Sequence, residues 1–470
     1  MKTIQYPRVE SKVDQVLSQA TFDLAHAQLM SWRQSAGSFG GLHLHGCWSD
    51  SSSLARRYHG QTIAGSYAVL QGFMDLYQLS GDEYWRGLVE DVVSNILFLQ
   101  TADGGFYHAS SEFEPTYSCL QSCPIHQGLP ILALLEYVAW PAADSRRKDI
   151  VRAAIDRHWQ WFEKYWWQRG NAWRQGLGMA GFCGVTNQDL VIVAALAKYA
   201  RVFEDDRKYC QFGLPTLNVY LSPAYYYPSL GLMERGDRPD FVERTAYYDV
   251  IVAMLKIIYT CTSDRRLPPV LDSIAGHLFD AMIIGEDGMT HLAWGAELNR
   301  SSELTVKKWI AAPYPLSSFP GLLHIMDDYL ARHPDPNRQR MLARLESTLA
   351  SYVLSDGTLA FSIAGDPLFS VVARPEPLWI YLRHRLKDRL RVPAARHIPC
   401  VHRSCGTTVF KSNGTMWSID QGSRRLYAGL KINPSGIALG TEEVVAGADL
   451  STIERAEVLE VLTQGQAQAS

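Results

Sequence analysis

The sequence lacks the features that would place it in a membrane or on nucleic acid. No segment approaches the roughly 18 consecutive uncharged apolar residues that a membrane-spanning helix requires. The 45 basic and 48 acidic residues leave a formal net charge of −3 and are interleaved along the chain. No basic stripe is therefore available to neutralise a run of phosphates. We expect neither a membrane protein nor a nucleic-acid-binding protein.

Targeting and disulfide signals are also missing. The N-terminal stretch MKTIQYPRVESKVDQ holds one lysine followed by polar residues, where a secretory signal needs a continuous apolar region. The eight cysteines are scattered through 470 residues, which is typical of reduced thiols and not of a disulfide framework. These features predict a cytoplasmic protein.

Cofactor motifs are absent as well. The chain has no phosphate-binding GxxxxGK[ST], no GxGxxG directly after a strand, no GxSxG and no HExxH. This disfavours nucleotide, dinucleotide, serine-hydrolase and zinc-peptidase functions. What is present is an apolar share of 47% with a charged share of 20%, which is typical of a packed globular protein. Acid/base chemistry without a cofactor is the prediction that remains.

Long helical segments of two kinds alternate along the chain. Segments with one charged face are expected on the outside of a helical assembly, whereas segments that are apolar on nearly every side must be surrounded by protein. The first kind comprises residues 83–100, 147–167, 270–283 and 338–353, with a first member near 11–33. The second kind comprises residues 61–79, 124–138, 188–199, 246–260 and 316–330, with a less regular sixth member near 375.

The apolar segments recur at roughly 55 to 70 residues, a period that suggests a repeat architecture. Pairing each one with a charged-face neighbour gives six helical hairpins, and an inner ring packed inside an outer ring buries all of their apolar faces. We therefore predict a mainly α protein, an (α/α)6 toroid, over residues 1–395. An irregular helical solenoid or two helical domains is the alternative.

Short β elements are predicted where turns interrupt the helices. Asp-Gly followed by apolar or aromatic residues occurs in the loops 101–108, 286–294 and 355–361, and this pattern is a hairpin signal. The stretch TTVFKSNGTMWSID alternates around an Asn-Gly turn and predicts two strands. Residues 396–470 are accordingly predicted to form a small β-rich C-terminal element with a Gln-rich tail.

Apolar inner helices that are entered from long aromatic loops such as TADGGFYH, followed by a β-rich C-terminal piece, resemble the six-hairpin (α/α)6-toroid glycosidase and polysaccharide lyase superfamily. The resemblance is architectural and covers most of the chain. It implies a ligand cleft at the N-terminal ends of the inner helices and, by analogy, a carbohydrate substrate.

One junction before an inner helix holds the leading candidate for chemistry. Asn187, Gln188 and Asp189 follow a glycine-rich loop and lead directly into the helix. The resemblance implies an acid/base aspartate near the start of an inner helix, as in six-hairpin hydrolases that act on unsaturated uronides, and Asp189 stands at such a place. The alternative is an aspartate that only complements the helix dipole.

A second acidic junction lies one hairpin further along the chain. Glu243 and Tyr247 are spaced to share a helix face, as are Arg244 and Tyr248. A glycosidase needs two carboxyl groups about 5 to 9.5 Å apart, one of them protonated to assist the leaving group. Asp189 and Glu243, from adjacent hairpins, are the predicted pair.

Elimination would use a different set of side chains. A lyase removes a proton with Tyr and His and neutralises the uronate with Arg or Asn, and the candidates for these roles are Tyr117, His126, Arg244 and Asn187. Cys119, Cys123 and His126 are also spaced along one helix face. Three such ligands without a second pair are a weak zinc motif, so no metal and no cofactor is predicted.

Aromatic and polar residues near the junctions favour a sugar ligand, because flat rings stack on a pyranose while polar neighbours bind its hydroxyls. The further candidates for substrate binding are His45, Trp48, Arg57, Glu114 and Trp294. The aromatic residues in or beside loops are Trp166, Trp167, Trp173, Tyr225, Tyr226, Tyr227, Trp294, Trp309 and Tyr314.

Three functions fit these residues. The first is cofactor-free cleavage of a glycosidic bond, by hydrolysis or β-elimination, in an oligosaccharide that contains uronate. The second is an isomerase, dehydratase or terpene-type cyclase on the same toroid, since sugar 2-epimerases and linalool dehydratase/isomerase are similar in architecture. QTADGGF resembles the QxxDGxW element of terpene cyclases, although a DxDD motif is missing. The third is a sugar-binding scaffold without catalysis. The predicted partner is a small molecule or an oligosaccharide.

Overall fold

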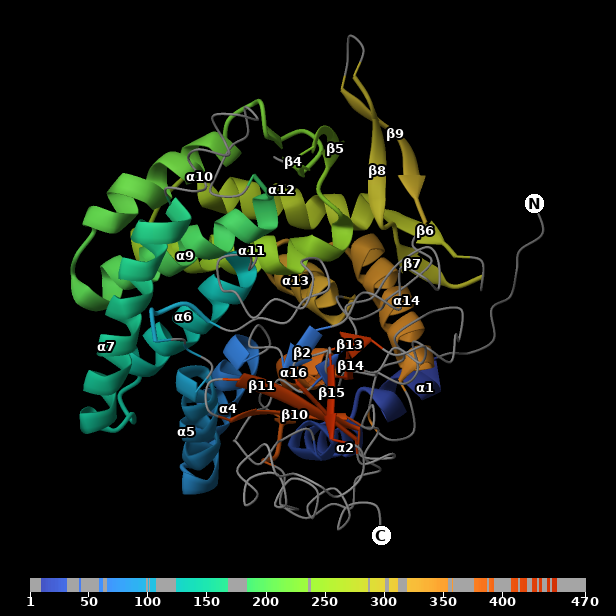
Figure 1. Cartoon of the computed structure of the whole chain (residues 1–470). Helices are drawn as coiled ribbons and strands as arrows, with labels where there is room; N and C mark the ends of the chain where they lie inside the picture. Colours follow the sequence, from blue (N-terminus) through green and yellow to red (C-terminus); the bar gives the residue numbers. More distant parts are fainter. Residues whose placement is uncertain are drawn as a thin grey trace, which may run out of the picture. The chain divides into compact units, whose positions relative to one another are not determined.

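The computed structural model describes residues 10–31, 42–43, 59–61, 66–98, 100, 102–106, 124–167, 184–235, 238–285, 288–300, 304–311, 319–353, 357, 376–386, 389–392, 407–412, 415–420, 425–428, 431–432, 438–439 and 442–445. Most of these residues are helical (Figure 1). The chain divides into two compact units that interleave along the sequence. The first unit comprises Met1–Ala27, Leu177–Ile363 and Arg374–Pro399, and the second comprises Gln28–Gly176, Ala364–Ala373 and Cys400–Ser470.

Among the described residues, two helical hairpins make up most of the helical part of the second unit. Their helices are α4 (Ser66–Ser80), α5 (Glu83–Phe98), α6 (Pro124–Ala139) and α7 (Ser145–Trp161), the last continued by the π-helical turn η2 (Phe162–Trp167). Helix α6 packs against α4, α5 and α7. Its central residues, from Ile131 to Leu135, have no exposed surface, whereas α7 begins with the polar run SRRKD, capped by the Asp144 carboxylate. The expected difference between inner and outer helices is therefore present.

The second unit also contains short antiparallel strands. A four-stranded sheet has the order β10-β11-β12-β15, and its first two strands flank the predicted Asn-Gly turn with Ser412 opposite Thr415. Two smaller sheets pair β1 with β2 and β13 with β14. The strands are β1 (Leu42–His43), β2 (His59–Gln61), β10 (Thr407–Ser412), β11 (Thr415–Asp420), β12 (Arg425–Ala428), β13 (Lys431–Ile432), β14 (Ala438–Leu439) and β15 (Glu442–Val445).

The first unit contains a longer series of packed helices. They are α1 (Glu10–Val16), α2 (Gln19–Ser31), α9 (Thr186–Phe203), η3 (Tyr209–Gly213), α10 (Leu214–Tyr220), η4 (Thr245–Tyr247), α11 (Tyr248–Thr262), α12 (Leu267–Asp280), α13 (Phe319–Arg332), α14 (Pro336–Tyr352) and α16 (Glu376–Leu386). Helices α9 and α11 lie side by side (Figure 1) and share the largest contact in the chain among the described elements. Both end at a residue in the left-handed conformation, Glu204 and Ser263.

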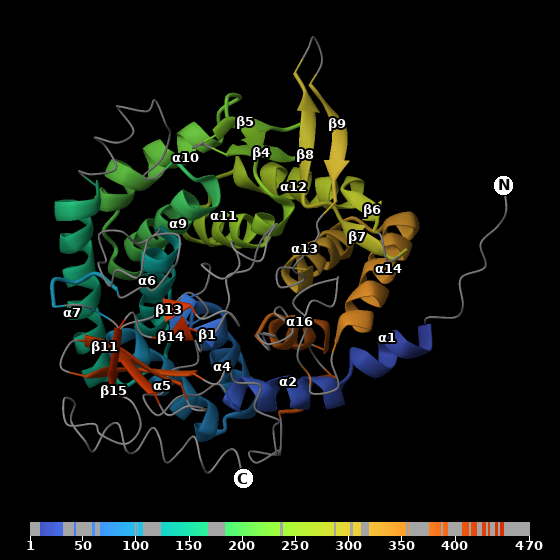
Figure 2. The same ribbon diagram turned by 45° about the vertical axis from the view of Figure 1, so that its right-hand side comes forward.

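Hairpins of strands connect the helices of the first unit. Strands β3, β4 and β5 form a three-stranded antiparallel sheet between α10 and α11, and β6 pairs with β7. The longer β8–β9 hairpin projects from the helices (Figure 2). The strands are β3 (Tyr226–Tyr227), β4 (Leu232–Arg235), β5 (Arg238–Val242), β6 (Met282–Ile284), β7 (Thr290–Leu292), β8 (Gly295–Asn299) and β9 (Thr305–Ile310).

The predicted helical segments are found within a few residues of their expected bounds. Two of the three Asp-Gly loops behave as expected, because residue Gln100 pairs with Phe106 and β6 pairs with β7. The third loop, 355–361, lies outside the described residues except for Gly357. The sequence interpretation missed helix α10 and the hairpins β3–β5 and β8–β9. The boundary after residue 395 stays a prediction. Within the described part of the chain, no helix is long and apolar enough to cross a membrane.

Candidate functional site

Strand β4 joins the N-terminal ends of two neighbouring inner helices. The hydroxyl of Thr186, the first residue of α9, donates to the Glu234 carbonyl at 2.6 Å. The Glu243 amide donates to the Met233 carbonyl at 2.7 Å. The Met233 amide in turn donates to the hydroxyl of Tyr248, the first residue of α11, at 2.9 Å. Two consecutive residues of one strand therefore hold the starts of α9 and α11 together.

Asp189 lies in the first turn of α9 and has no exposed surface. Its Oδ2 atom accepts a hydrogen bond from the Tyr220 hydroxyl at 2.8 Å and another from the Gly184 amide at 3.2 Å. A buried carboxylate needs such donors, because burial without them would destabilise its charged form. The two bonds also tie α10 and Gly184, which lies two residues before the helix, to α9, so part of the role of Asp189 is structural.

The two other predicted residues of this turn differ in exposure. Asn187 is buried, and its Oδ1 atom has no hydrogen-bond partner among the described residues. Gln188 is half-buried. The Oδ1 atom of Asn187 is thus an acceptor that a ligand hydroxyl would satisfy, and substrate binding by Asn187 stays a prediction.

Glu234 on strand β4 is a third buried carboxylate that the sequence interpretation missed. It is 2% exposed, and its Oε1 atom accepts from the Tyr227 hydroxyl and pairs with the Arg300 guanidinium at 2.6 Å. Its Oε2 atom has no hydrogen-bond partner among the described residues. Burial, reinforced by the bond to Glu234, raises the pKa of Tyr227, so this phenol stays protonated and remains a donor.

Glu243 follows strand β5 and is 1% exposed. Its Oε1 atom accepts from the Arg244 amide at 3.1 Å. Next to it, burial and the Glu243 charge raise the pKa of Tyr248, whose hydroxyl bonds the Met233 amide. Tyr248 has no exposed surface. Its geometry is that of a structural residue, and substrate binding by Tyr248 stays a prediction.

The expectation that Glu243 and Tyr247 share a face of one helix is wrong. Arg244 is extended, with φ −70° and ψ 140°, Thr245–Tyr247 form a single 3-10 turn, and α11 begins only at Tyr248. The Thr245 amide donates to the Trp294 carbonyl at 2.9 Å. The backbone here thus hydrogen-bonds to Trp294, which precedes strand β8, and becomes α-helical only afterwards. The i, i+4 spacing of a helix therefore does not apply to Glu243 and Tyr247.

A cation and an aromatic ring lie next to Glu243. The Arg244 guanidinium carbon is 4.2 Å from the centre of the Trp294 ring and 5.9 Å from that of Tyr247. All three side chains are half-buried. No described carboxylate forms an ion pair with Arg244. The stacked pair offers a positive charge and a flat apolar ring to the same ligand.

We refer to Asp189, Glu234 and Glu243 as the acidic junction. All three belong to the first unit. The remaining predicted residues are placed elsewhere or not described: His126 is on α6 in the second unit, with a side chain outside the described part. His45, Trp48, Arg57, Glu114, Tyr117, Cys119 and Cys123 lie outside the described residues. A pocket shared by all of them stays a prediction.

No protein-family model matches this sequence, and no curated protein matches it significantly. Solved structures do match. A cellobiose 2-epimerase from Bacillus thermoamylovorans B4167 aligns with a TM-score of 0.53 at 12% identity, over 78% of this chain and 98% of its own. A sugar epimerase from a ruminal bacterium aligns with a TM-score of 0.53 at 12% identity, over 81% of this chain and 100% of its own.

The chain has the (α/α)6 toroid fold that the sequence predicted. At this level of identity the likeness establishes the fold and carries no function with it.

Proposed function

We propose that this protein is a carbohydrate-active enzyme whose active site lies at the acidic junction. The observation that supports the proposal most strongly is that three buried carboxylates stand at or next to the N-terminal ends of two inner helices that strand β4 joins. Carboxylates are seldom buried unless they are paired or take part in function. The matched toroids are named as sugar epimerases, which agrees with a sugar as the substrate.

The chemistry that we propose is cofactor-free cleavage of a glycosidic bond in an oligosaccharide. Glu243 and Asp189 are the candidate acid and base, one giving a proton to the leaving oxygen and the other activating water or accepting a proton. Glu234 pairs with the Arg300 guanidinium at 2.6 Å and adds a third carboxylate to the site. An ionised carboxylate stabilises a positively charged sugar transition state.

The uronate part of the proposal rests on Arg244. Its guanidinium has no described carboxylate partner and lies over Trp294. A sugar ring stacked beside Trp294 would bring a uronate carboxylate within reach of this cation, and Arg binds carboxylates with a planar pair of hydrogen bonds.

Isomerisation of a sugar is the second candidate function. It is favoured by one observation, that the structures aligned at a TM-score of 0.53 are both named as epimerases. The cytoplasmic location predicted from the sequence remains part of the proposal for either reaction.

Product analysis separates the reactions. The purified chain is incubated with neutral and uronate-containing oligosaccharides. Hydrolysis adds water and releases a new reducing end, elimination releases a reducing end together with an ultraviolet-absorbing unsaturated uronate, and epimerisation conserves mass but changes the NMR spectrum of one sugar carbon. We expect new reducing ends with uronate-containing substrates. No turnover of any member of either group would refute a carbohydrate-active enzyme.

Asp189→Asn tests whether Asp189 has a chemical role in addition to its structural one. The amide keeps an oxygen that accepts from Tyr220, so the free energy of unfolding should fall by no more than about 1–3 kcal/mol. Turnover should fall by about 10² to 10⁴-fold, the usual contribution of an acid or base. Tyr220→Phe is the matched control, because it removes the hydrogen bond from the Tyr220 hydroxyl to Asp189 and keeps the carboxylate. Equal losses of turnover in both variants would leave Asp189 with a structural role only.

A further inference from the structure

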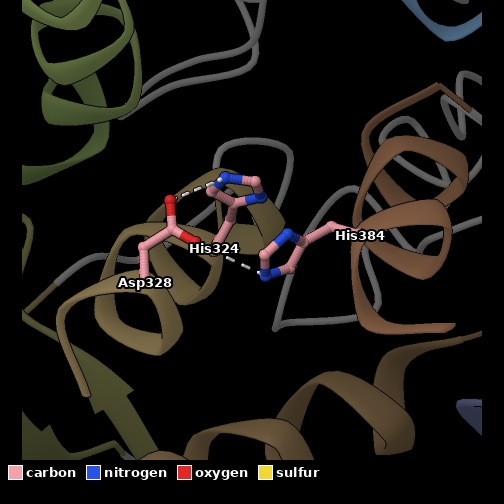
Figure 3. Close-up of side chains that lie close together, drawn as sticks. All are labelled: His324, Asp328 and His384. Carbon is pink, nitrogen blue, oxygen red and sulfur yellow. Dashed lines mark ion pairs between the residues drawn. The ribbon is translucent and has the colours of Figure 1, made fainter. Parts of the chain in front are cut away.

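A second group of polar side chains lies between helices α13 and α16, apart from the acidic junction. His324 and Asp328 are one turn apart on α13, and His384 faces them from α16 (Figure 3). The His324 Nε2 atom is 3.2 Å from Asp328 Oδ2, and the two imidazole ring centres are 3.7 Å apart. In the described part of the chain, these three residues place one ligand atom each within 4.8 Å of the others.

The charges around this group favour the forms that bind a metal. Burial lowers the pKa of His324, which keeps its imidazole neutral, although Asp328 acts in the opposite direction and His384 in the same one. Burial raises the pKa of Asp328, but hydrogen bonds from His324 and Lys256 outweigh this and hold that pKa low. A neutral imidazole and an ionised carboxylate are the protonation states that coordinate cations.

Two further charged groups face the cluster from neighbouring elements. Lys256 on α11 lies 2.6 Å from Asp328 Oδ2, and Asp327 Oδ2 lies 2.9 Å from His384 Nε2. Lys256 therefore engages one carboxylate oxygen, while Oδ1, 4.0 Å from His384 Nε2, faces the second imidazole. A cation on one carboxylate oxygen orients a ligating carboxylate, as partners of metal ligands commonly do.

We infer that His324, Asp328 and His384 form a site for a divalent transition metal, of which Zn²⁺ fits best. Two imidazoles with one carboxylate are a known zinc ligand set, and imidazole selects zinc over magnesium or calcium. Zinc–ligand bonds of about 2.0–2.1 Å put tetrahedral donor atoms about 3.3 Å apart. The present donor atoms are close to that spacing, at 3.2 Å between His324 Nε2 and Asp328 Oδ2 and 4.0 Å between His384 Nε2 and Asp328 Oδ1. The ion links α13 to α16, and the site is independent of the function proposed above.

Access to the group is open on one side. The His384 side chain is 8% exposed, whereas those of His324 and Asp328 are 35% and 30% exposed. An ion can thus enter from solvent and complete its coordination with water.

Titration of the full chain with Zn²⁺ after removal of metal by a chelator tests this site. We expect one equivalent to bind by calorimetry, Co²⁺ to give the visible absorption of a tetrahedral site, and the melting temperature to rise with the Zn²⁺ concentration. His384→Gln and Asp328→Asn should each weaken Zn²⁺ binding by at least about tenfold. His333→Gln is the control, since His333 lies just after α13, pairs with Asp272 and should leave the affinity unchanged.

No stoichiometric binding of Zn²⁺, or binding that His384→Gln and Asp328→Asn leave intact, would overturn the site. If a variant melts differently from the wild type in the absence of metal, His324→Gln replaces it. Asp189→Asn should bind Zn²⁺ normally, so a failure of the proposed enzymatic function and a failure of this site are distinguishable.

Discussion

Replacing Tyr248 with phenylalanine tests whether one hydroxyl holds strand β4 on helix α11. The Tyr248 hydroxyl accepts from the Met233 amide at 2.9 Å, and both residues have no exposed surface. Phenylalanine keeps the ring and leaves no large cavity. The change therefore removes one hydrogen bond and leaves a buried amide without its acceptor.

The free energy needed to open the structure around the Met233 amide should fall by about 1–3 kcal/mol, the usual cost of an unsatisfied buried donor. The loss should be local, because Met233 and Glu234 are the residues through which the hairpin contacts the starts of α9 and α11. Each 1.4 kcal/mol is tenfold in an equilibrium constant, so opening of the Met233 amide should become about 5- to 150-fold more frequent.

Hydrogen exchange at the Met233 amide measures this effect directly, since it reports local opening as well as global unfolding. The control is Tyr259→Phe, which makes the same chemical change on the solvent side of α11, where Tyr259 is 41% exposed. The free energy of unfolding of that variant should differ from the wild-type value by less than about 0.5 kcal/mol. If Tyr248→Phe leaves the exchange of the Met233 amide unchanged, the hydroxyl does not hold the hairpin and our account of the acidic junction is wrong.

Two further predictions concern the packing of this hairpin on α12. Gly231→Ala should destabilise the chain by about 2–4 kcal/mol in denaturant titrations, because Gly231 has φ +62° and an added Cβ would lie 2.2 Å from the Ser273 carbonyl oxygen. Gly288→Ala, at φ +75° with no atom near the added Cβ, should cost only about 1 kcal/mol, and an equal loss in both variants would refute close packing as the cause. Burial lowers the pKa of His277 from 6.5 to about 4, so between these values the unfolded chain binds a proton that the folded chain does not. The free energy of unfolding should therefore fall as the pH decreases from 6.5 toward 4, by an amount on the order of 2 kcal/mol at pH 5. His277→Gln should reduce this slope, and a slope equal to that of the wild type would contradict the assignment.

The helical framework was predictable because a helix that is buried on most sides has a distinctive, largely apolar sequence. Helices α6 and α9 are apolar on nearly every side, and the structure buries all of these sides. The C-terminal strands β10 and β11 were predictable for a similar reason, since alternation around Asn-Gly fixes both the turn and the register.

The elements that the sequence interpretation missed have weaker sequence patterns. Strand β9 reads TVKKWI, and most of its residues are exposed, so no apolar face distinguishes it from a loop. Helix α10 is short and follows a π-helical turn, a geometry that shifts the usual spacing.

The site was predictable only in part. Asp189 and Glu243 could be proposed because each stands at or shortly before the start of an apolar helix. Glu234 could not, because a single acid in a short strand is informative only once the strand is known to be buried. Its one sequence signal is a carboxylate directly after the apolar pair Leu232 and Met233. The expectation that Glu243 and Tyr247 share a helix face was wrong for a similar reason. The hydrogen bond from the Thr245 amide to the Trp294 carbonyl joins residues far apart in the sequence, and the sequence pattern does not indicate it.

The central claim is that the acidic junction performs acid/base chemistry on a sugar, and Glu243→Gln tests it most directly. Glutamine keeps the oxygen that accepts from the Arg244 amide and removes only the ionisable group. Glu346→Gln is the matched control, as Glu346 is a 6% exposed carboxylate of the same unit that bonds Tyr381 and Arg385. We predict that kcat on the oligosaccharide substrate falls by about 10² to 10⁴-fold in Glu243→Gln and stays near the wild-type value in Glu346→Gln. Wild-type turnover by Glu243→Gln would contradict the claim.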